Sequence, residues 1–310
     1  MPKGMVLAAG LGKRLRPLTK WMPKPLLPVA NVPVMAQGIS RLRAAGITEV
    51  CVNVSYKAPD IQNVFRDGSS LGVSLHWSVE TKLLGTAGGM KNAEHFLRDD
   101  LVVIIPGDAA LDVDVTRVIE LHKSREATAT IGTLRVSDPS QYGVVVTDAD
   151  NRVLKFQEKP PPGTEISNDA NTGIYVFDPR VFELIPPGAF FDFAKGVFPI
   201  LLEEGLPFYA CPVTGYWTDI GDPRAYLQAN LDFLARRLVI QGEGEWVGSG
   251  YVGTGARVSG VELERCVVGP DSCIAEGSHL AECVVWPGTV VSDAMNLRSA
   301  ILTPYGTHQL

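Results

Sequence analysis

The chain has 310 residues, which is more than one hydrophobic core usually holds, so we expect two domains. With 45% hydrophobic and 20% charged residues it can bury a sizeable core, which excludes global disorder. The formal net charge of −6 argues against a general binder of nucleic acid or of membrane surfaces. No run approaches the roughly 20 apolar residues of a bilayer span, and the N-terminus lacks a signal-peptide cleavage region, so we expect a cytoplasmic protein.

Short apolar runs alternate with helical patterns through the first 125 residues. We predict strands over 4–9, 49–54, 73–79 and 101–105, and helices over 34–45, 60–65, 88–96 and 115–125. Strands that alternate with helices in this way indicate right-handed crossovers and a mostly parallel sheet. Ligands of such sheets bind at the carboxyl ends of the strands, so we expect the site there.

From Ala127 the predicted strands follow one another more closely. We predict strands within 127–136, 143–148, 153–160 and 172–177, and helices over 192–204 and 223–237. This half is expected to complete the same domain, which we place at residues 1–237, and to supply a lid or floor for the site.

After Arg237 glycine and valine recur and helical periodicity is lost. Apolar residues fall six apart in two series, Ile240, Trp246, Val252, Val258 and then Val268, Ile274, Leu280, Trp286. This hexapeptide pattern predicts a β-helix over residues 238–310, in which three short strands close each coil. An ordinary antiparallel extension is the alternative, and the interruption between the two series leaves the number of coils open. The five cysteines form no CxxC pair and mostly lie among apolar residues, which predicts reduced, buried thiols.

A glycine-rich turn follows the first strand and leads directly into a cationic segment. Its glycines let backbone amides approach an anion, and Lys13, Arg14, Arg16 and Lys24 can neutralise it, which indicates a polyphosphate site. A dinucleotide fingerprint would need glycine where Leu15 stands, and a P-loop would need Ser or Thr where Arg14 stands, so neither is supported. For Arg16, pairing with an acidic neighbour is an equal alternative to ligand contact.

Several motifs, taken in order, resemble those of the sugar-phosphate nucleotidylyltransferases: GLGKRLRPLT, PKPLLPV, LLGTAGG, PGD, EKP, NTGIYVF and WTDIGDP. The resemblance covers about Lys3 to Asn230, and the hexapeptide tail is similar to the β-helix appended in several members. It implies an α/β fold with a Rossmann-like, mostly parallel mixed sheet, followed by a short left-handed β-helix. Within the family the chain looks most similar to mannose-1-phosphate guanylyltransferases, although Lys13 stands where many members have Thr. Those enzymes join GTP and a hexose 1-phosphate into GDP-sugar and pyrophosphate.

The chemistry of that reaction explains the cations independently. The sugar phosphate oxygen attacks the α-phosphorus of a nucleotide, and these two anions repel each other until their charges are offset. We expect Arg14 to hold the leaving pyrophosphate and Lys24 to hold the α-phosphate. Because pyrophosphate is a stabilised leaving group, neither a covalent nucleophile nor a strong general base is required.

Two aspartates are expected to bind Mg²⁺, a role taken mainly from the resemblance. Asp108 follows the buried run LVVIIPG, and Asp219 lies in WTDIGD before a predicted helix. Hard oxygen ligands suit Mg²⁺, which commonly takes only one or two carboxylates together with phosphates and waters. For Asp219 a helix N-cap is the alternative, which Asp222 before Pro223 fits better.

The resemblance also implies the remaining contacts. The implied nucleotide-binding residues are Ala8, Ala9, Gly10, Gly12, Lys13, Arg14, Glu80, Gly85 and Thr86. In the family the EKP motif places Lys159 on the sugar phosphate and Glu158 on a sugar hydroxyl, while Asn171 and Gly143 match the other sugar contacts. A surface ion pair between Glu158 and Lys159 at a strand end is the alternative.

Glu80 bears on the choice of base. A carboxylate only accepts hydrogen bonds, and the N1 and N2 edge of guanine only donates them. Thymidylyl and many uridylyl members have glutamine here, so Glu80 favours GTP. An exposed acid in a loop is the alternative.

Three other functions stay open from the sequence. A uridylyl- or thymidylyltransferase acting on glucose 1-phosphate would use the same charged residues, whereas a non-catalytic sugar-nucleotide sensor would bind product and release no pyrophosphate. Acyl transfer by the tail would need a catalytic histidine and a long prism, but the tail offers only His279 and a terminal His308. A short β-helix exposes an open end and apolar sides such as Trp246 and Trp286, so we expect a homo-oligomer.

Overall fold

The computed structural model describes residues 1–310, and the chain divides into two compact units that interleave along the sequence. The first unit consists of Met1–Leu11, Gly38–Gly107 and Val113–Gly215. The second unit consists of Gly12–Gln37, Asp108–Asp112 and Tyr216–Leu310. The division into domains 1–237 and 238–310 stays a prediction. The predicted domains are continuous in sequence, whereas each compact unit combines three separate segments.

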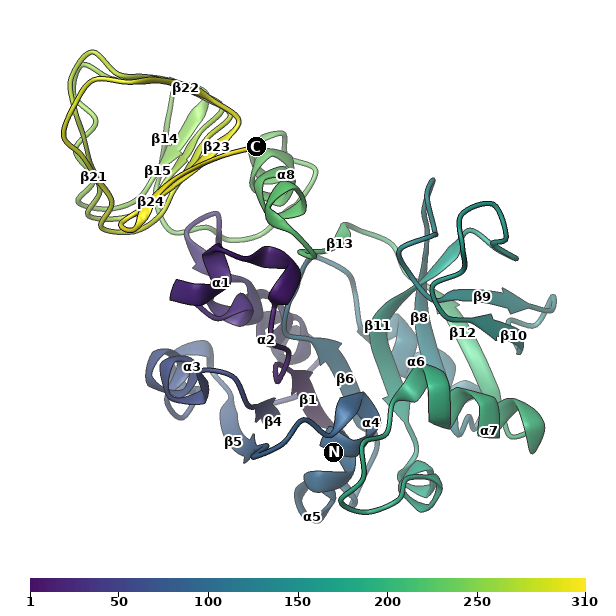
Figure 1. Ribbon diagram of the computed structural model, residues 1–310. Helices are drawn as coiled ribbons and strands as arrows, with labels where there is room; N and C mark the ends of the chain where they lie inside the picture. Colours follow the sequence, from purple (N-terminus) through teal and green to yellow (C-terminus); the bar gives the residue numbers. More distant parts are fainter. The chain divides into compact units, whose positions relative to one another are not determined.

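A parallel sheet forms the centre of the first unit (Figure 1). Its order is β6 (Val102–Pro106), β1 (Lys3–Leu7), β4 (Glu49–Val54) and β5 (Ser74–Val79), and each neighbouring pair is parallel. Strands β1 and β6 are almost entirely buried, which explains their continuous apolar sequences. The predicted parallel α/β architecture is therefore confirmed.

Helices connect successive strands along the chain, as predicted. They are α2 (Val34–Ala44), which passes from the second unit into the first, α3 (Ala58–Phe65), α4 (Gly85–Asn92), α5 (Glu94–Leu97) and α6 (Thr116–Ser124), with the 3₁₀ helix η3 (Ser69–Leu71). The single helix predicted over 88–96 is two helices, because the backbone at Ala93 leaves helical geometry with φ −97° and ψ 10°. None of the helices combines the length and the apolar character that crossing a bilayer requires.

Antiparallel pairing extends the sheet beyond β6. The added strands are β8 (Ala129–Arg135), β9 (Val144–Thr147), β10 (Val153–Gln157), β11 (Asp169–Phe177) and β12 (Phe208–Pro212). Strand β11 runs antiparallel to both β6 and β8, so the nine-stranded sheet is mixed. The sequence pattern missed β12, which pairs in parallel with β8.

Aromatic side chains pack this part of the sheet against the helices that follow it. The predicted helix over 192–204 begins as a π-helix, η5 (Phe193–Val197), and continues as α7 (Phe198–Glu203), after the 3₁₀ helix η4 (Pro179–Leu184). Phe193 stacks on Phe177 with 4.9 Å between ring centroids, and both rings are buried. Burying an aromatic side chain of this size stabilises the fold by about 1.5–3 kcal/mol. This packing fixes η5 against β11.

Short elements make up the part of the second unit that precedes the tail. They are η1 (Lys13–Leu15), α1 (Leu18–Trp21), η2 (Lys24–Leu26), β2 (Pro28–Val29), β3 (Val32–Pro33), β7 (Ala109–Leu111), β13 (Trp217–Asp219) and α8 (Pro223–Leu234). Strand β13 pairs antiparallel with β7, so Asp219 lies opposite Ala109. Asp222 caps α8 by accepting a hydrogen bond from the Ala225 amide at 2.9 Å, which confirms the predicted cap.

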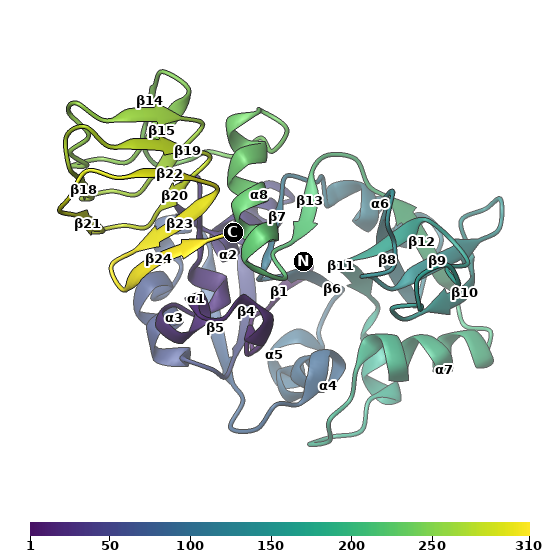
Figure 2. The same cartoon turned by 45° about the horizontal axis from the view of Figure 1, so that its top comes forward.

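The tail is a β-helix of stacked triangular coils, as the hexapeptide pattern predicts (Figures 1 and 2). Its first face holds β14 (Glu245–Val247), β15 (Gly250–Val252), β17 (Val267–Val268), β20 (Val284–Val285), β23 (Ala300–Thr303) and β24 (Gly306–Gln309). The second face holds β16 (Glu262–Glu264), β19 (His279–Ala281) and β22 (Asn296–Arg298), and the third holds β18 (Cys273–Ile274) and β21 (Val290–Val291). Tyr251 pairs with Val267, Val267 with Val284 and Val284 with Ile301, so successive coils contain 16 or 17 residues. Antiparallel pairing occurs only at the terminal strands β14 and β24.

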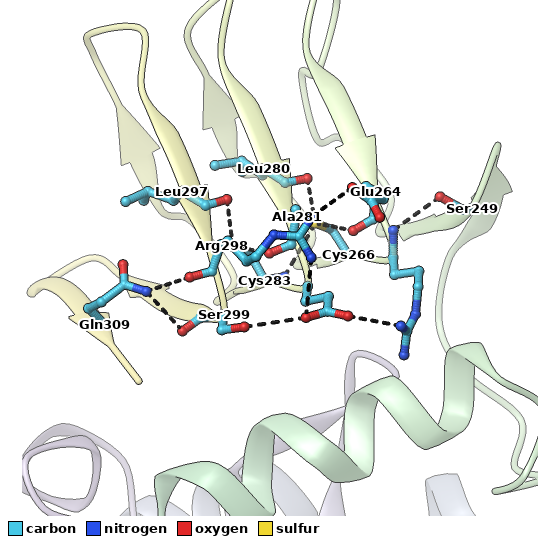
Figure 3. Close-up of polar contacts among 12 residues, drawn as sticks. Ser249, Glu264, Cys266, Leu280, Ala281, Cys283, Leu297, Arg298, Ser299 and Gln309 are labelled. Atoms are coloured by element: carbon cyan, nitrogen blue, oxygen red, sulfur yellow. Dashed lines mark hydrogen bonds and ion pairs between the residues drawn. The ribbon is translucent and has the colours of Figure 1, made fainter.

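Polar contacts join successive coils between the second face and the first (Figure 3). Arg265 Nη1 lies 2.8 Å from Glu282 Oε1, and Arg298 contacts both Glu264 and Glu282. Exposed ion pairs of this kind contribute about 0–1 kcal/mol each. The apolar interior therefore stabilises the tail more than this ladder does. All five cysteines are free and four are buried, in agreement with the sequence-based prediction.

Trp286 corrects one prediction, because its side chain is only 1% exposed. It packs in the cluster that the tail shares with α8, whereas its neighbour Val285 lies in the cluster inside the coils. Trp246 is 39% exposed, stacks with Phe233, and lies 3.9 Å from the Arg236 guanidinium. A repeat pattern assigns residues to coils but does not show which element covers a face of the β-helix.

Candidate functional site

The second unit brings together four of the predicted site residues, Arg14, Lys24, Asp108 and Asp219, which we call the Lys24 cluster. Lys24 Nζ donates to Asp108 Oδ2 and to Asp219 Oδ1, at 2.7 Å in each case. Lys24 begins η2, Asp108 directly precedes β7, and Asp219 ends β13. Because β7 and β13 pair antiparallel, the two aspartates reach the same ammonium although 111 positions separate them.

Arg14 extends the cluster toward solvent. Its Nη2 lies 3.2 Å from Asp219 Oδ2, and its side chain is largely exposed. An added Cβ at Gly221 would come within 3.1 Å of the Arg14 guanidinium, so this glycine of the WTDIGDP motif leaves room for the arginine. Lys13 is also exposed. Arg16 forms no ion pair, so the structure does not support the alternative that Arg16 pairs with an acidic neighbour.

The electrostatics of the cluster centre on Lys24, whose side chain is 8% exposed. Burial lowers the pKa of this ammonium, but the charges of Asp108 and Asp219 and their hydrogen bonds outweigh burial and leave the pKa above its ordinary value. Lys24 is therefore a cation throughout the physiological range. It offsets the mutual repulsion of the two carboxylates.

The donor set of the Lys24 cluster fits a divalent cation. Two carboxylates converge on one atom, and their hard oxygens are the ligands that Mg²⁺ prefers. No third acidic, histidine or cysteine side chain joins them. Mg²⁺ commonly takes one or two carboxylates and completes its shell with phosphates and waters. The side chains of Asp108 and Asp219 thus match such a site.

The glycine-rich turn is divided between the units. Ala8, Ala9 and Gly10 follow β1 in the first unit, and Gly12 and Lys13 begin the second. Gly12 has a φ of +58°, and a Cβ there would lie 2.9 Å from the Thr19 methyl group and 3.5 Å from the Lys24 Cβ. Glycine is therefore required both by the backbone conformation and by the close approach of α1.

In the first unit, Glu80 lies in a hydrogen-bonded group that also contains Ala8, Asn53 and Leu84, which we call the Glu80 bracket. Glu80 Oε1 accepts from Asn53 Nδ2 at 2.7 Å, and Glu80 Oε2 accepts from the Leu84 amide at 3.0 Å. Asn53 Oδ1 in turn accepts from the Ala8 amide at 2.9 Å. Glu80 is only 4% exposed, so it is not the exposed loop acid of the alternative interpretation. Each carboxylate oxygen already has one protein donor.

Gly85 and Thr86 begin α4 next to this bracket. Gly85 has a φ of +75°, and a Cβ there would lie 2.5 Å from the Phe191 carbonyl oxygen. Thr86 Oγ1 donates to Asp192 Oδ2 and accepts from the Phe193 amide, at 2.9 Å in both cases. The N-terminus of α4 is thus held by the segment that leads into η5.

Three of the predicted sugar contacts, Gly143, Glu158 and Asn171, lie together in the first unit, and we call them the Glu158 cluster. The Asn171 amide donates to the Gly143 carbonyl at 2.8 Å, and a Cβ on Gly143 would lie 2.9 Å from Glu158 Oε2. Asn171 Nδ2 donates to the Tyr175 hydroxyl at 2.9 Å. Burial raises the pKa of Glu158, with Asp192 acting in the same direction and Lys159 against it.

Lys159 is exposed and has a φ of +42°. Glu158 and Lys159 form no ion pair within 4 Å, so the structure does not support the alternative of a surface pair. The positive φ of Lys159 turns the chain just after β10. Glu158 and Lys159 therefore need not point to opposite faces, as successive residues of a strand do.

Sequence reasoning missed Asn53 and Asp192, although each connects predicted site residues. Asn53 bonds both Ala8 and Glu80, and Asp192 bonds Thr86 and caps η5 through the Ala194 amide. Asn53 stands inside the apolar run VCVNV, and a polar residue within a buried strand was the available signal. Asp192 precedes a helix, so the sequence alone suggests an N-cap. Asp192 does cap η5, and this role gave no sign of its second contact, with Thr86.

Family models match nearly the whole chain. Residues 3–236 match the model described as nucleotidyl transferase, and residues 239–305 match the model described as GlmU-like, C-terminal hexapeptide. The chain is 42% identical over 249 residues to a UTP–glucose-1-phosphate uridylyltransferase of Synechocystis sp., and 38% identical over 233 residues to a mannose-1-phosphate guanylyltransferase of Mycobacterium tuberculosis. These alignments cover 76% and 74% of this chain.

Each of the two alignments covers 64% of the relative, so the chain spans less than two thirds of the length of these proteins. Among solved structures, the chain is similar to a Bacillus anthracis protein assigned as a glucose-1-phosphate thymidylyltransferase and crystallised with a sucrose. The TM-score is 0.69 at 29% identity, over 78% of this chain and 98% of that one. The motifs, the mixed sheet with its hexapeptide tail and these matches agree: the chain belongs to the nucleotidyl transferase family.

Proposed function

We propose that the protein is a sugar-1-phosphate nucleotidylyltransferase that joins a nucleoside triphosphate and a hexose 1-phosphate into an NDP-sugar and pyrophosphate. The observation that carries the proposal is the Lys24 cluster, in which one buried cation and two carboxylates meet beside the exposed Arg14. Two anionic substrates need such fixed charges at the reacting phosphorus. Family membership supports the same class of reaction.

In the proposed reaction, an oxygen of the sugar phosphate forms a bond to the α-phosphorus. The bond from that phosphorus to the bridging oxygen breaks, and pyrophosphate leaves with the electron pair. Lys24 would donate to the α-phosphate, and Arg14, the more exposed cation, would hold the departing pyrophosphate. Both residues act through charge and position, and neither transfers a proton.

Asp108 and Asp219 would supply the carboxylate ligands for Mg²⁺. When bound, the ion supplies charge that stabilises the phosphate oxygens. The carboxylates supply the ligands and also keep the Lys24 ammonium in place until a phosphate competes for it.

The family motifs imply further contacts to the base and the sugar, and the residues concerned lie in the first unit. Gly10, Gly85 and Thr86, together with the backbone around Ala8 and Ala9, supply the nucleotide contacts that the family motifs imply. Glu158, Lys159, Asn171 and Gly143 would supply the sugar-phosphate contacts in the same way. Glu158 is half-buried beside Gly143, where its carboxylate can accept from a sugar hydroxyl.

For the substrates we propose GTP and mannose 1-phosphate. The acceptor-only carboxylate of Glu80 supports guanine, and so do the curated relatives named mannose-1-phosphate guanylyltransferase. The second candidate is UTP with glucose 1-phosphate, which the 42% identical Synechocystis relative favours. Both oxygens of Glu80 already accept from protein donors, so a guanine base would bind to their remaining lone pairs.

A pyrophosphate-release screen tests the proposal. Purified protein with Mg²⁺ is given GTP, UTP, dTTP or ATP together with mannose 1-phosphate or glucose 1-phosphate, and the NDP-sugar is identified by mass spectrometry. We expect the highest kcat/KM with GTP and mannose 1-phosphate, and the Asp108→Asn variant should lose Mg²⁺-dependent turnover. No pyrophosphate with any pair, while GDP-mannose still binds, would instead identify a non-catalytic sensor.

We further propose a homo-oligomer. Strand β14 lies at the edge of the first face of the β-helix, and Trp246 and Val247 on it are exposed. An edge strand with exposed apolar side chains favours pairing with another chain. Light scattering at micromolar concentration should give a mass above one chain, and a purely monomeric solution would contradict this proposal.

A further inference from the structure

The β-helix contacts the segment that carries Lys24 through a chain of buried hydrogen bonds. Trp286 Nε1 donates to the Tyr226 hydroxyl at 3.1 Å, and the Tyr226 hydroxyl donates to the Pro28 carbonyl at 2.8 Å. Trp286 belongs to the β-helix, Tyr226 to α8, and Pro28 lies four residues after Lys24. All three lie in the second unit, and the two aromatic side chains are fully buried.

The same surface of α8 binds the backbone on both sides of Val29. Asn230 Oδ1 accepts from the Ala30 amide at 3.1 Å, and Asn230 Nδ2 donates to the Tyr226 carbonyl at 3.1 Å. Asn31 Nδ2 then donates to the carbonyls of Glu243 and Val268, at 3.0 Å each. The hairpin that follows Lys24 is therefore bonded to α8 and directly to the β-helix.

Apolar packing supports these bonds. Leu15, Leu18 and Leu27, which flank Lys24 in sequence, share one buried cluster with Tyr226 and Trp286. Trp21 stacks on Tyr305 of the last hairpin with 4.1 Å between ring centroids. The Lys24 ammonium is held by the two aspartates, and the Lys24 carbonyl accepts from the amide of Leu27 at 3.1 Å. Because Leu27 belongs to this buried cluster, the backbone position of Lys24 depends on this support.

We infer that the β-helix positions the catalytic lysine, and that Trp286 and Tyr226 are positioning residues that act through the Pro28 carbonyl. The inference rests on the proposed function of Lys24 as the ligand of the α-phosphate. The bond from Trp286 polarises the Tyr226 hydroxyl and so strengthens the bond that this hydroxyl donates to Pro28. Loss of either bond loosens η2 and lets the ammonium leave the geometry that the transition state requires.

Conservative variants test this inference. Tyr226→Phe removes the hydroxyl and Trp286→Phe removes the Nε1 donor, while each keeps an aromatic ring in the core. We expect kcat to fall about three- to tenfold in each, with an unchanged KM for the sugar phosphate, whose proposed contacts lie in the first unit. In the double variant the Trp286 change should add nothing, because Trp286 acts through the Tyr226 hydroxyl.

The matched control is Trp246→Phe, the same change on the same β-helix at a residue outside the relay. Its kcat should equal that of the unchanged protein. Multiplicative losses in the double variant, or losses explained entirely by a lower free energy of unfolding in guanidinium titrations, would overturn the inference.

A second measurement needs no turnover. Hydrogen exchange followed by mass spectrometry should show faster exchange in peptides covering residues 12–30 for Tyr226→Phe and Trp286→Phe, and not for Trp246→Phe. Unchanged exchange there would overturn the inference even if the protein is active. If the unchanged protein releases no pyrophosphate from any substrate pair, the proposed function fails, while the exchange result still decides whether the relay holds the segment.

Discussion

Among single residues, Lys24 determines the charge balance of its cluster. Its ammonium is the only cation that contacts both Asp108 and Asp219. Without it the two carboxylates face each other in a partly buried place, where their repulsion is weakly screened. The two hydrogen bonds to the aspartates also fix the position of the ammonium, so the cation is already in place before any phosphate binds.

Lys24→Met removes this charge while keeping an unbranched side chain. We expect pyrophosphate release to fall by about 10²–10³ in kcat, the usual cost of losing one transition-state donor. We also expect Mn²⁺ to bind the nucleotide-free protein more tightly, because the ammonium no longer competes for the carboxylates, and electron paramagnetic resonance measures this. Lys20→Met, an exposed residue of α1, removes the same charge and should change neither quantity. Turnover near that of the unchanged protein in Lys24→Met would contradict the assignment.

Glu80 combines a proposed function in base recognition with an observed one in bracing. Glu80→Gln replaces one acceptor oxygen with a donor, so either Asn53 or Leu84 loses its partner inside the protein. An unpaired buried donor costs about 1–3 kcal/mol of folding free energy. We expect both this loss, measured by guanidinium unfolding, and a several-fold drop in the kcat/KM ratio of GTP to UTP. The exposed Glu120→Gln on α6 is the control and should show neither effect.

A drop in stability with an unchanged nucleotide ratio would assign Glu80 to bracing alone. It would also remove the argument from Glu80 for GTP.

At the scale of elements, α4 shows how packing overrides helix propensity. Gly88 lies in the interior of α4, where alanine would normally stabilise a helix by about 1 kcal/mol. A Cβ at this position would lie 2.7 Å from the Ala189 carbonyl oxygen and 3.3 Å from the Phe191 amide nitrogen. These are backbone atoms of the segment that leads into η5, which cannot move away cheaply.

Gly88→Ala should therefore destabilise the protein by about 1–3 kcal/mol, the usual range for an overpacked site. Chemical denaturation of the variant measures this. Ser40→Ala, at an exposed position of α2, is the control and should be neutral or slightly stabilising, as propensity alone predicts. A stabilised Gly88→Ala variant would show that the segment from Ala189 to Phe191 yields to α4.

The elements that the sequence predicted have either a continuous apolar run or a clear helical period. The parallel strands β1, β4 and β6 and the helix α8 with its Asp222 cap follow from local patterns alone. Strands β7 and β13 are three residues long, too short for a periodic signal, and they exist because they pair with each other. The π-helical start at η5 was missed because Phe193 and Phe198 pack into the sheet in a way that periodicity does not encode.

For the candidate site, the resemblance names the expected residues but does not say how they contact one another. Lys24, Asp108 and Asp219 meet as expected. The engagement of Glu80 by Asn53 and the burial of Trp286 depend on tertiary neighbours that are distant in sequence. No local pattern contains that information.

At the scale of the whole molecule, buried groups that retain their protons make the fold sensitive to alkali. Burial raises the pKa of Tyr175 and of Tyr226 above their ordinary value of 10.0, and it raises the pKa of Cys51 to about 12. The pKa of Lys24 is likewise above its ordinary value of 10.5. For all four groups the folded protein holds a proton that the unfolded chain releases at a lower pH.

A group of this kind contributes its full stabilisation below the pKa of the unfolded chain and loses it as the pH rises toward the folded value. The free energy of unfolding should therefore start to fall near pH 9, where unfolded cysteine ionises, and fall more steeply above pH 10 as tyrosine and then lysine follow. Each pH unit costs about 1.4 kcal/mol per group. Guanidinium titrations from pH 8 to 11 measure the slope, and Tyr175→Phe should reduce it by about one group's share. An unfolding free energy that stays constant over that range would contradict this prediction, because it would mean that these side chains ionise as readily in the folded protein as in the unfolded chain. The burial of the tyrosines and of Cys51 among packed apolar side chains opposes such ionisation.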